Sequence, residues 1–244
     1  MKLVDGRIRL SASDYSNFLA CRHLTRLDIA GAHGLTSPLY TTDLGFEALV
    51  RRGEEHESKV LEHFTDMGWN VETVTNPFED FERAIAESDL AVDGGSDVIY
   101  QAALMHEDRL GFPDFLVRAD LLGGDGGYEV VDAKLARSAK ARAVLQAAFY
   151  SRLLAEKTGV QPRRMHLALG NREFASFDFN DYASYARQVD RLLRDFTASE
   201  PSFPPSDTYP DPVEHCAICR WRVACVRRRR DDDDLSLIAG ISLL

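Results

Sequence analysis

A glycine-rich stretch in the middle of the chain constrains the fold more than any other feature. The residues "GGDGG" at 123–127 separate two apolar runs, "GFPDFLVRADLL" at 111–122 and "YEVVDAKL" at 128–135. Such a stretch between two apolar runs is typical of a β-hairpin, so the runs are expected to pair as neighbouring strands. From Leu44 to Gly170 the expected order is helix, three to four strands with this hairpin, helix and strand. This order predicts an α/β sandwich with a mixed sheet.

Periodicity and capping residues predict the other elements. The first helix is expected to begin at Ser13 and to end at Gly31, and a longer helix is expected over about 44–67. Further helices are expected at 78–91, 140–159 and 181–199, and further strands at 69–75, 97–104, 164–170 and 172–179. No GxGxxG motif follows a first strand and no GxxxxGK(S/T) motif occurs, which excludes a Rossmann fold and a P-loop ATPase.

The composition is that of a globular protein. The chain has 244 residues, 45% of them hydrophobic, and a net charge of −10. This acidity argues against nucleic-acid binding, but only weakly, because enzymes that hold cations concentrate acids in one cleft. The first residues lack the apolar segment of a secretion signal, and no apolar run approaches the ~20 residues that span a bilayer. We therefore expect a cytoplasmic protein with no membrane contact.

The strand "YEVVDAKL" ends with an acid and a base on one face. Asp132 and Lys134 are two residues apart, and placing both at the rim of an apolar strand costs desolvation energy. Pairing within the hairpin can bring Asp114 near Asp132. Two carboxylates suit Mg²⁺ or Mn²⁺, and a nearby ammonium can offset charge on a phosphate, which together favour phosphodiester hydrolysis. Two alternatives stay open: Asp120 as the first acid, and a solvated, inert Asp–Lys pair.

Four short motifs, taken together, resemble a known nuclease family. "RGEEH", "GFPD", "VVDAK" and "QAAFY" follow the order of the His, Asp, (Asp/Glu)-x-Lys and Gln-x-x-x-Tyr motifs of RecB-type nucleases in the PD-(D/E)xK superfamily. The resemblance implies a restriction-endonuclease-like mixed sheet flanked by helices. It implies that the ligands of the catalytic ion are His56, Asp114, Asp132 and the carbonyl of Ala133. It also implies that Lys134 is the catalytic base or charge stabiliser and that DNA or the catalytic groups are positioned by Gln146 and Tyr150.

The chain has four cysteines, three of them close together. Cys216, Cys219 and Cys225 form a C-x2-C-x5-C pattern, whereas Cys21 lies far upstream. Four thiolates suit Zn²⁺ or a 4Fe–4S cluster, and four inert thiols are the remaining alternative. Together with the segment "SASDYSNFLACRH", this arrangement resembles the iron–sulfur nucleases, among them the AddB-type end-processing subunit and the CRISPR adaptation exonuclease. The resemblance implies a 4Fe–4S cluster that ties the first helix to the C-terminal segment.

The resemblance also implies how the chain is organised and what it does. It gives a nuclease core at 44–170, a helical iron–sulfur lobe made of 1–43 and 171–234, and a short apolar tail at 235–244 where the chain reads as cut short. The implied function is a metal-dependent DNA exonuclease or end-processing nuclease acting on single-stranded ends in repair, recombination or defence against foreign DNA. A helicase or another DNA-processing protein is the expected partner. A non-catalytic DNA-binding scaffold subunit and an RNA-directed phosphodiesterase are the alternatives.

Overall fold

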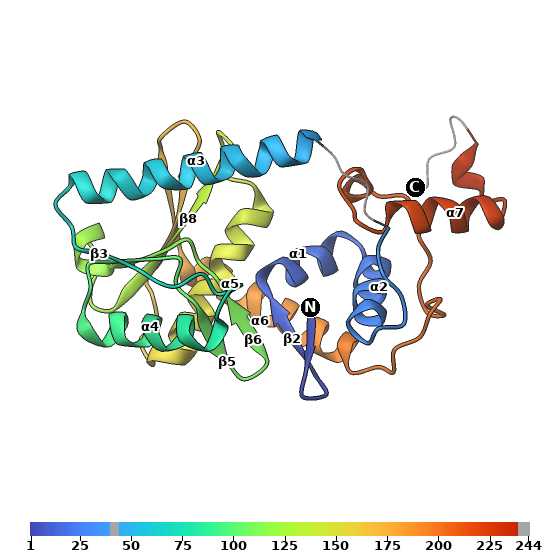
Figure 1. Cartoon of the computed structure of the whole chain (residues 1–244), viewed down its shortest axis with the longest axis horizontal. Coiled ribbons are helices and arrows are strands. Elements are labelled where there is room, and N and C mark those ends of the chain that lie inside the picture. The colour runs from blue at the N-terminus through green and yellow to red at the C-terminus, as the bar shows by residue number, and fades with distance from the viewer. Residues whose placement is uncertain (40–43, 239–244) are drawn as a thin grey trace. The chain divides into compact units, whose positions relative to one another are not determined.

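The computed structural model describes residues 1–39 and 44–238 (Figure 1). The chain forms two compact units. Unit 1 combines Met1–Thr42 with Arg191–Leu244, and unit 2 is Asp43–Asp190. Most of the predicted apolar tail, from residue 239 onwards, lies outside the described residues, and so does the predicted boundary near residue 43.

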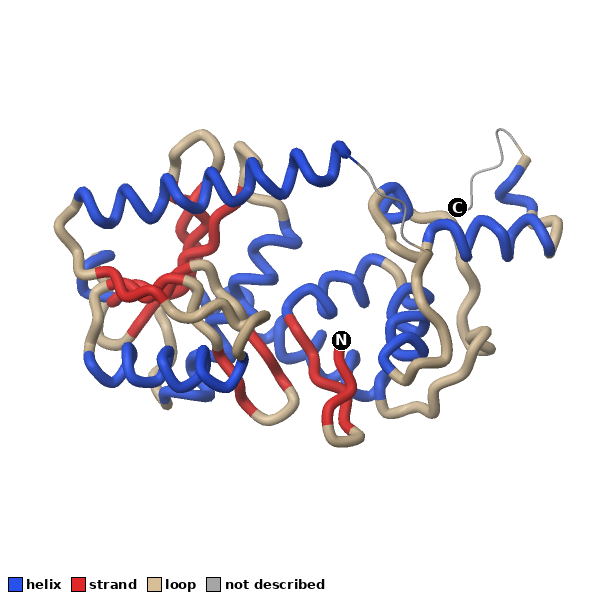
Figure 2. The backbone as a smooth tube through the Cα atoms, viewed as in Figure 1, coloured by secondary structure: helices blue, strands red, loops and turns tan. Residues whose placement is uncertain are grey.

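Unit 2 contains a six-stranded sheet with the order β10-β9-β8-β7-β4-β3. Its strands, drawn in red in Figure 2, are β3 (Val71–Thr73), β4 (Val98–Tyr100), β7 (Phe115–Arg118), β8 (Tyr128–Lys134), β9 (Arg164–Leu169) and β10 (Phe174–Asp178). β8 is antiparallel to β7 and parallel to β9, so the sheet is mixed at its centre. The mixed α/β class predicted from the sequence is confirmed.

Helices cover both faces of this sheet. The helices of unit 2 are α3 (Leu44–Asp66), α4 (Phe81–Gly94), α5 (Ala141–Thr158) and the first part of α6 (Phe179–Thr197). Alternation along β9 separates two cores, because Ala168 packs with Phe64 of α3 whereas Leu167 packs with Ala147 of α5. Both cores are apolar and closely packed, so the sheet is a rigid support for side chains at its strand ends.

The hairpin between β7 and β8 has a longer connection than predicted. β7 ends at Arg118, and the next residues form a 3-10 turn, η1 (Ala119–Leu122). The guanidinium of Arg118 holds the carboxylate of Asp120 at 2.6 Å, and Gly123 ends the turn with a φ of 73°. The strand predicted over 111–122 is therefore wrong beyond Arg118, whereas the antiparallel pairing of the two runs is confirmed.

A second hairpin leads into β7. Its strands are β5 (Leu104–His106) and β6 (Arg109–Gly111). A Cβ atom on Gly111 would lie 2.8 Å from Cδ2 of Leu153 on α5, so only glycine allows this close approach. The segment from Gly111 to Asp114 is thereby held directly against α5.

Unit 1 is built from shorter elements. These are β1 (Lys2–Val4), β2 (Arg7–Ser11), α1 (Ala12–Ala20), α2 (Arg22–Ala32), α7 (Arg222–Asp231) and the 3-10 turns η2 (Glu214–Ala217) and η3 (Leu235–Leu237). β1 and β2 form an antiparallel hairpin that is absent from the sequence-based prediction. Its turn residues Asp5 and Gly6 both have positive φ, as a two-residue hairpin turn requires.

The single helix predicted from Ser13 to Gly31 is wrong, because Cys21 divides it into α1 and α2. Cys21 has an extended backbone with φ of −163°, and its Sγ accepts a hydrogen bond from the Leu24 N–H at 3.3 Å. The cysteine therefore caps α2. The N-terminal cap of α1 is Ser11, whose N–H donates to the Asp14 carboxylate at 2.8 Å.

The division between core and lobe also differs from the predicted boundary at residue 170. β10 pairs with β9 in the sheet of unit 2, and Phe179 and Ala183 belong to the core around α5. The break between the units falls within α6, after Asp190. Residues 171–190 therefore belong with the core. A short turn is enough to join β9 to its antiparallel neighbour β10, so the chain stays in the sheet beyond residue 170.

Candidate active site and cysteine cluster

The β7–β8 hairpin brings two carboxylates and an ammonium together. Phe115 pairs with Val131, and the same register places Asp114 opposite Asp132. The Ala133 N–H donates to Oδ2 of Asp114 at 2.7 Å. The ammonium of Lys134, on the same face of β8 as Asp132, forms an ion pair with its carboxylate.

Burial and neighbouring charges shift the pKa values of the acids and the lysine in this cluster. Asp132 is 1% exposed, and in the part of the chain that the structure describes its carboxylate meets the ammonium of Lys134 and no other hydrogen-bond donor. Burial raises the pKa of Asp114 well above its usual range, and the charge of Asp132 raises it further. Burial lowers the pKa of Lys134, but the charges of Asp132 and Asp114 outweigh this effect and raise it overall. A cation added to such a site would relieve an excess of negative charge.

His56, predicted as a metal ligand, faces the neighbouring strand β9. Its Nε2 lies 2.9 Å from the carbonyl oxygen of Ala168, the residue that pairs with Ala133, so this nitrogen donates to the backbone of β9. The neighbouring Glu57 also contributes to the acid cluster, because its charge raises the pKa of both Asp114 and Lys134. The role of His56 as a metal ligand stays a prediction.

Two polar residues at the end of β4, Tyr100 and Gln101, hold Glu57 in place. Nε2 of Gln101 donates to Oε1 of Glu57 at 3.1 Å. Burial raises the pKa of Tyr100, and so do the charge of Glu57 and the hydrogen bond to it, so the phenol stays protonated and donates. The sequence carried a signal for Glu57, since it lies seven residues before the buried Phe64 and thus on the same stripe of α3.

Gln146 and Tyr150 lie one turn apart on α5, near the acids, and contact each other. Nε2 of Gln146 donates to the Tyr150 hydroxyl at 3.0 Å. Burial raises the pKa of Tyr150, the charge of Asp132 raises it further, and hydrogen bonds from Gln146 and the Phe112 backbone partly offset these effects. The phenol therefore remains neutral and holds the segment that leads to Asp114.

The alternative first acid, Asp120, does not join the cluster. It is exposed, and Arg118 binds both of its carboxylate oxygens at 2.9 and 2.6 Å. This ion pair lowers the pKa of Asp120. The geometry thus favours Asp114 as the partner of Asp132.

A basic groove adjoins the acids. A cavity of about 360 Å³ is lined by residues that include Lys134, Lys140, Arg142 and Gln146. α5 begins at Ala141, so its first free N–H groups and the positive end of its dipole lie at this groove. The groove suits an anion such as a phosphate group.

The four cysteines lie close together in unit 1. Cys21, Cys216, Cys219 and Cys225 all line one small cavity between α2 and the C-terminal segment, and all four are free thiols. Burial raises the pKa of Cys225 to about 12, and the neighbouring thiols add to this effect. The Val213 N–H donates to Sγ of Cys216 at 3.4 Å.

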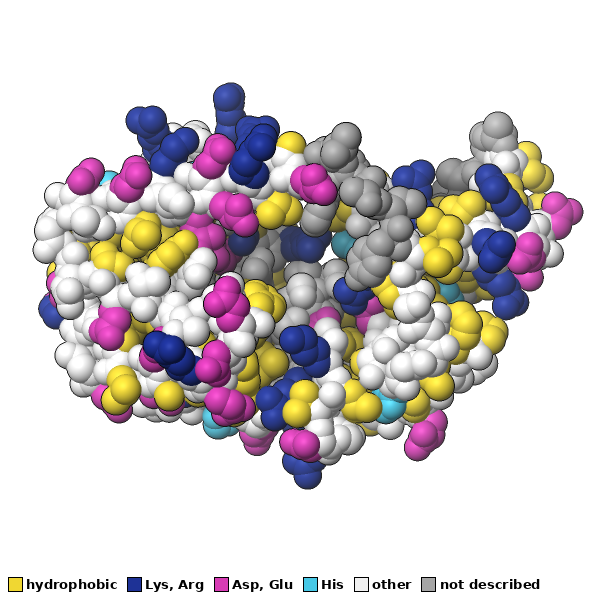
Figure 3. All heavy atoms as spheres, in the orientation of Figure 1, with side chains coloured by type: hydrophobic (Ala, Val, Ile, Leu, Met, Phe, Trp, Pro, Cys, Tyr) yellow, Lys and Arg dark blue, Asp and Glu magenta, His cyan; other side chains and the backbone are white. Residues whose placement is uncertain are grey.

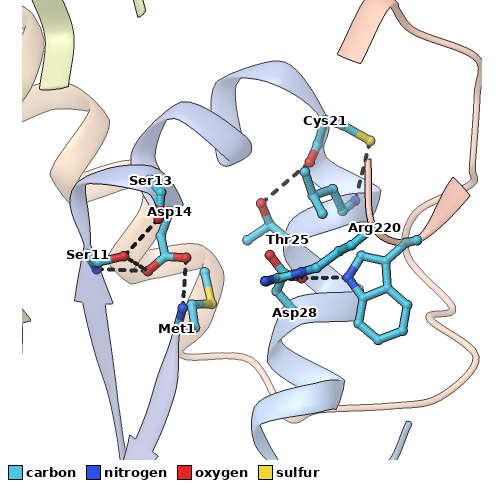
Figure 4. Close-up of polar contacts among 10 residues, drawn as sticks. Met1, Ser11, Ser13, Asp14, Cys21, Thr25, Asp28 and Arg220 are labelled. Atoms are coloured by element: carbon cyan, nitrogen blue, oxygen red, sulfur yellow. Dashed lines mark hydrogen bonds and ion pairs between the residues drawn. The ribbon is translucent and has the colours of Figure 1, made fainter. Parts of the chain in front are cut away.

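An ion pair between the buried Asp28 and the partly exposed Arg220 links the two chain segments of this cluster (Figure 4). Arg220 donates to Oδ1 of Asp28 at 2.7 Å, and the indole N–H of Trp221 donates to the same oxygen. Trp221 is 2% exposed and packs with Leu24 and Leu27 of α2. Trp221 therefore serves as a core residue of unit 1.

Arginine side chains gather over α7, and acidic side chains lie beyond its end (right side of Figure 3). The run is less uniform than its sequence. Arg229 is buried and donates to the carbonyl of Pro210 at 2.7 Å, and Arg228 pairs with Asp232. Only part of the basic run is therefore available to a ligand.

In the parts of the chain that the structure describes, no three His, Cys, Asp or Glu side chains are arranged as a ready metal-binding group. This holds for the acids and for the cysteines. Over residues 1–39 and 44–238, no helix combines the length and apolar character that a membrane span requires.

No protein-family model and no curated protein matches the chain. A solved structure described as "Crystal structure of SSO0001" aligns with a TM-score of 0.38 and 14% sequence identity, over 91% of this chain and 87% of that chain. This similarity is too low to carry an argument about fold or function.

Proposed function

We propose that the protein is a metal-dependent nuclease that cleaves DNA at or near single-stranded ends. The observation that carries the proposal is the convergence of Asp114, Asp132 and Lys134 beside a basic groove. The resemblance of the motifs around these residues to RecB-type nucleases gives the substrate class. A DNA-processing protein such as a helicase is the proposed partner.

The acids fit a hard divalent cation. Mg²⁺ is usually bound by one or two carboxylates, with water and substrate oxygens completing its shell, so a closed group of three side chains is not required. Asp132 offers a buried carboxylate whose one donor among the described residues is the ammonium of Lys134. We assign Asp114, Asp132 and the Ala133 carbonyl as ligands, with Glu57 as the nearby third acid. A bound Mg²⁺ or Mn²⁺ supplies a Lewis acid and a more acidic water.

The other residues of the site hold and orient the substrate. Lys134 stays charged at neutral pH because its pKa is raised, so it stabilises negative charge on the phosphate rather than acting as a base. Tyr150 and Gln146 fix the backbone at Phe112 and therefore the position of Asp114. Lys140 and Arg142 attract the neighbouring phosphates.

Cleavage of end-labelled single strands tests this proposal. With Mg²⁺ or Mn²⁺ the wild type should cut DNA, and Asp132→Asn and Lys134→Ala should each lose at least about 100-fold in rate. Asp120→Asn is the matched control, because its carboxylate is exposed and bound to Arg118. Matched RNA strands distinguish the RNA-directed alternative. DNA binding without cleavage under any divalent ion would instead support the scaffold alternative.

We also propose that the four cysteines hold a 4Fe–4S cluster. Four sulfurs line one cavity, and backbone N–H groups donate to two of them, as is common around iron–sulfur sites. Protein purified without oxygen should be brown, with broad absorbance near ~400 nm and about four irons per chain. A colourless, folded protein that contains zinc would assign the site to Zn²⁺ instead.

A further inference from the structure

An exposed aromatic ring packs on Phe112, in the segment that leads to Asp114. Phe78 is 76% exposed, more than any other large hydrophobic side chain in the part of unit 2 that is described. Its ring centroid lies 5.5 Å from that of Phe112, and the ring of Phe81 meets Phe112 edge-on at 6.3 Å. Phe81 and Phe112 thus support a small aromatic ladder that ends in a ring with an open face.

The position of Phe78 is fixed by its own turn. Its N–H donates to Oδ1 of Asn76 at 2.9 Å, and the N–H groups of Glu79 and Asp80 donate to the Asn76 carbonyl. The side chain of Asp80 then caps α4 by accepting from the Arg83 N–H at 3.1 Å. A ring held on such a turn loses little conformational freedom when a ligand stacks on it.

The ladder is connected to the acids through Phe112. Phe112 lies two residues before Asp114 and follows Gly111, where an added Cβ atom would lie 3.0 Å from the ring of the buried Tyr150. The Tyr150 hydroxyl accepts from Gln146, which also lines the basic groove. One connected set of contacts therefore fixes the aromatic rings, the acid pair and the groove relative to one another.

The charges around the ladder decide what can bind there. Glu79 and Glu82 flank Phe78 and are exposed, so they repel phosphates on the α4 side. Lys134, Lys140 and Arg142 attract phosphates on the side of the groove. An exposed apolar ring together with a separate basic groove suits a ligand whose flat bases and charged backbone are separate, as in an unpaired strand.

We propose that Phe78, backed by Phe112, stacks on a base of a single-stranded DNA whose phosphates enter the groove at Lys134. The inference rests on the proposed nuclease function and deepens it, because a paired base has no free face to offer. Phe78 is thus a residue that selects unpaired DNA and positions it, without taking part in the chemistry.

Binding of labelled oligothymidylate in EDTA, where no cleavage occurs, tests the stacking. Phe78→Ala should bind about tenfold more weakly than the wild type, because one base–aromatic stack is lost. Phe78→Leu keeps an apolar side chain but has no ring, so it should bind nearly as weakly as Phe78→Ala. An abasic strand of equal length has the same phosphates but no bases, so it should bind wild type and Phe78→Ala equally.

Leu90→Ala is the matched control, since Leu90 is 70% exposed on the same helix that follows Phe78. It should change neither affinity. Equal affinity of wild type and Phe78→Ala for oligothymidylate, or an equal loss on the abasic strand, would overturn the inference. A wild type that shows the base-dependent difference but never cleaves would refute the nuclease proposal alone. A wild type that cleaves while Phe78→Ala binds normally would refute the stacking alone.

Discussion

The acid cluster of unit 2 and the cysteine cluster of unit 1 are both proposed to bind metal, yet they rest on different foundations. Asp114 directly precedes β7 and Asp132 lies in β8, in a sheet with apolar cores on both faces. The cysteines lie at a helix boundary, in a 3-10 turn, in the loop after it and in a short helix, and they pack against the buried residues Leu24, Leu27 and Trp221. The fold of unit 2 holds the acids in place, whereas metal binding by the cysteines is expected to stabilise the fold of unit 1.

This contrast follows from what each site costs without a metal. Asp114 and Asp132 are buried acids whose mutual repulsion opposes folding, and the sheet bears that cost. In unit 1, burial raises the pKa of Cys219 and Cys225, so these two thiols are neutral when metal-free. Neutral thiols cost little free energy to bury, but they also contribute little to the stability of unit 1 until a metal binds to them.

The largest effect should come from breaking the cysteine cluster. Cys219→Ser should destabilise unit 1 by about 4 kcal/mol or more, because the binding energy of a structural metal is folding energy. Hydrogen exchange measures this unit by unit. Amides of α2 and α7 should lose protection while those of β8 and β9 keep it. Uniform protection in the variant would show that unit 1 folds without its metal.

The next effect distinguishes two neighbours on α3. Glu57→Gln should reduce Mn²⁺-dependent cleavage by about 10–100-fold, because it removes a charge from the acid cluster. His56→Gln should change the rate by less than about threefold, since glutamine can still donate to the Ala168 carbonyl. Initial rates at saturating Mn²⁺ provide the comparison. The reverse order would identify His56 as the residue of α3 that serves the site.

The choice between His56 and Glu57 shows how much of the candidate site can be predicted from the sequence. The motif "RGEEH" locates the right turn of α3, but it does not say which of two adjacent side chains serves the site. Helical periodicity does not decide between them, because His56 lies four residues before the buried Val60 and Glu57 lies seven residues before the buried Phe64. The choice between Asp114 and Asp120 is of another kind, because it depends on the register of the hairpin and on the ion pair with Arg118.

Unit 1 was harder to predict than the sheet. The strands of unit 2 are apolar and are separated by glycine-rich turns, so their pairing can be read from pattern. The hairpin of β1 and β2 is largely polar and carries no such pattern. The break at Cys21 lies inside a continuous helical periodicity and depends on the cysteine sulfur acting as a cap, which sequence preferences do not anticipate.

A smaller loss is expected where the two segments of unit 1 are tied together. Asp28→Asn weakens the pairing with Arg220 but keeps an oxygen for the Trp221 indole, so unit 1 should lose about 2 kcal/mol. Urea unfolding followed by Trp221 fluorescence, in a Trp69→Phe background that removes the other tryptophan, measures this loss. Asp207→Asn is the control, because Asp207 is 48% exposed in its pair with Arg26 and should shift the midpoint less. Equal shifts would mean that burial of the Asp28 pair contributes nothing.

The smallest effect has the opposite sign. Asp114→Asn should stabilise the metal-free protein by about 1 kcal/mol, because it removes a carboxyl group that is costly to ionise. Burial and the charge of Asp132 both raise the pKa of this group. The amide oxygen still accepts from the Ala133 N–H, and the new amide N–H groups can donate to the carboxylate of Asp132. Thermal unfolding with and without Mn²⁺ measures both parts of this prediction.

Mn²⁺ should raise the melting temperature of the wild type and leave Asp114→Asn almost unchanged, because only a protein that binds the ion gains stability from it. The same substitution should abolish cleavage. A variant that is less stable than the wild type in EDTA would show that the acid pair supports the fold, and the contrast between the two sites would then disappear. A gain in stability coupled to a loss of activity would instead mark the acids as groups kept for chemistry at the expense of the fold.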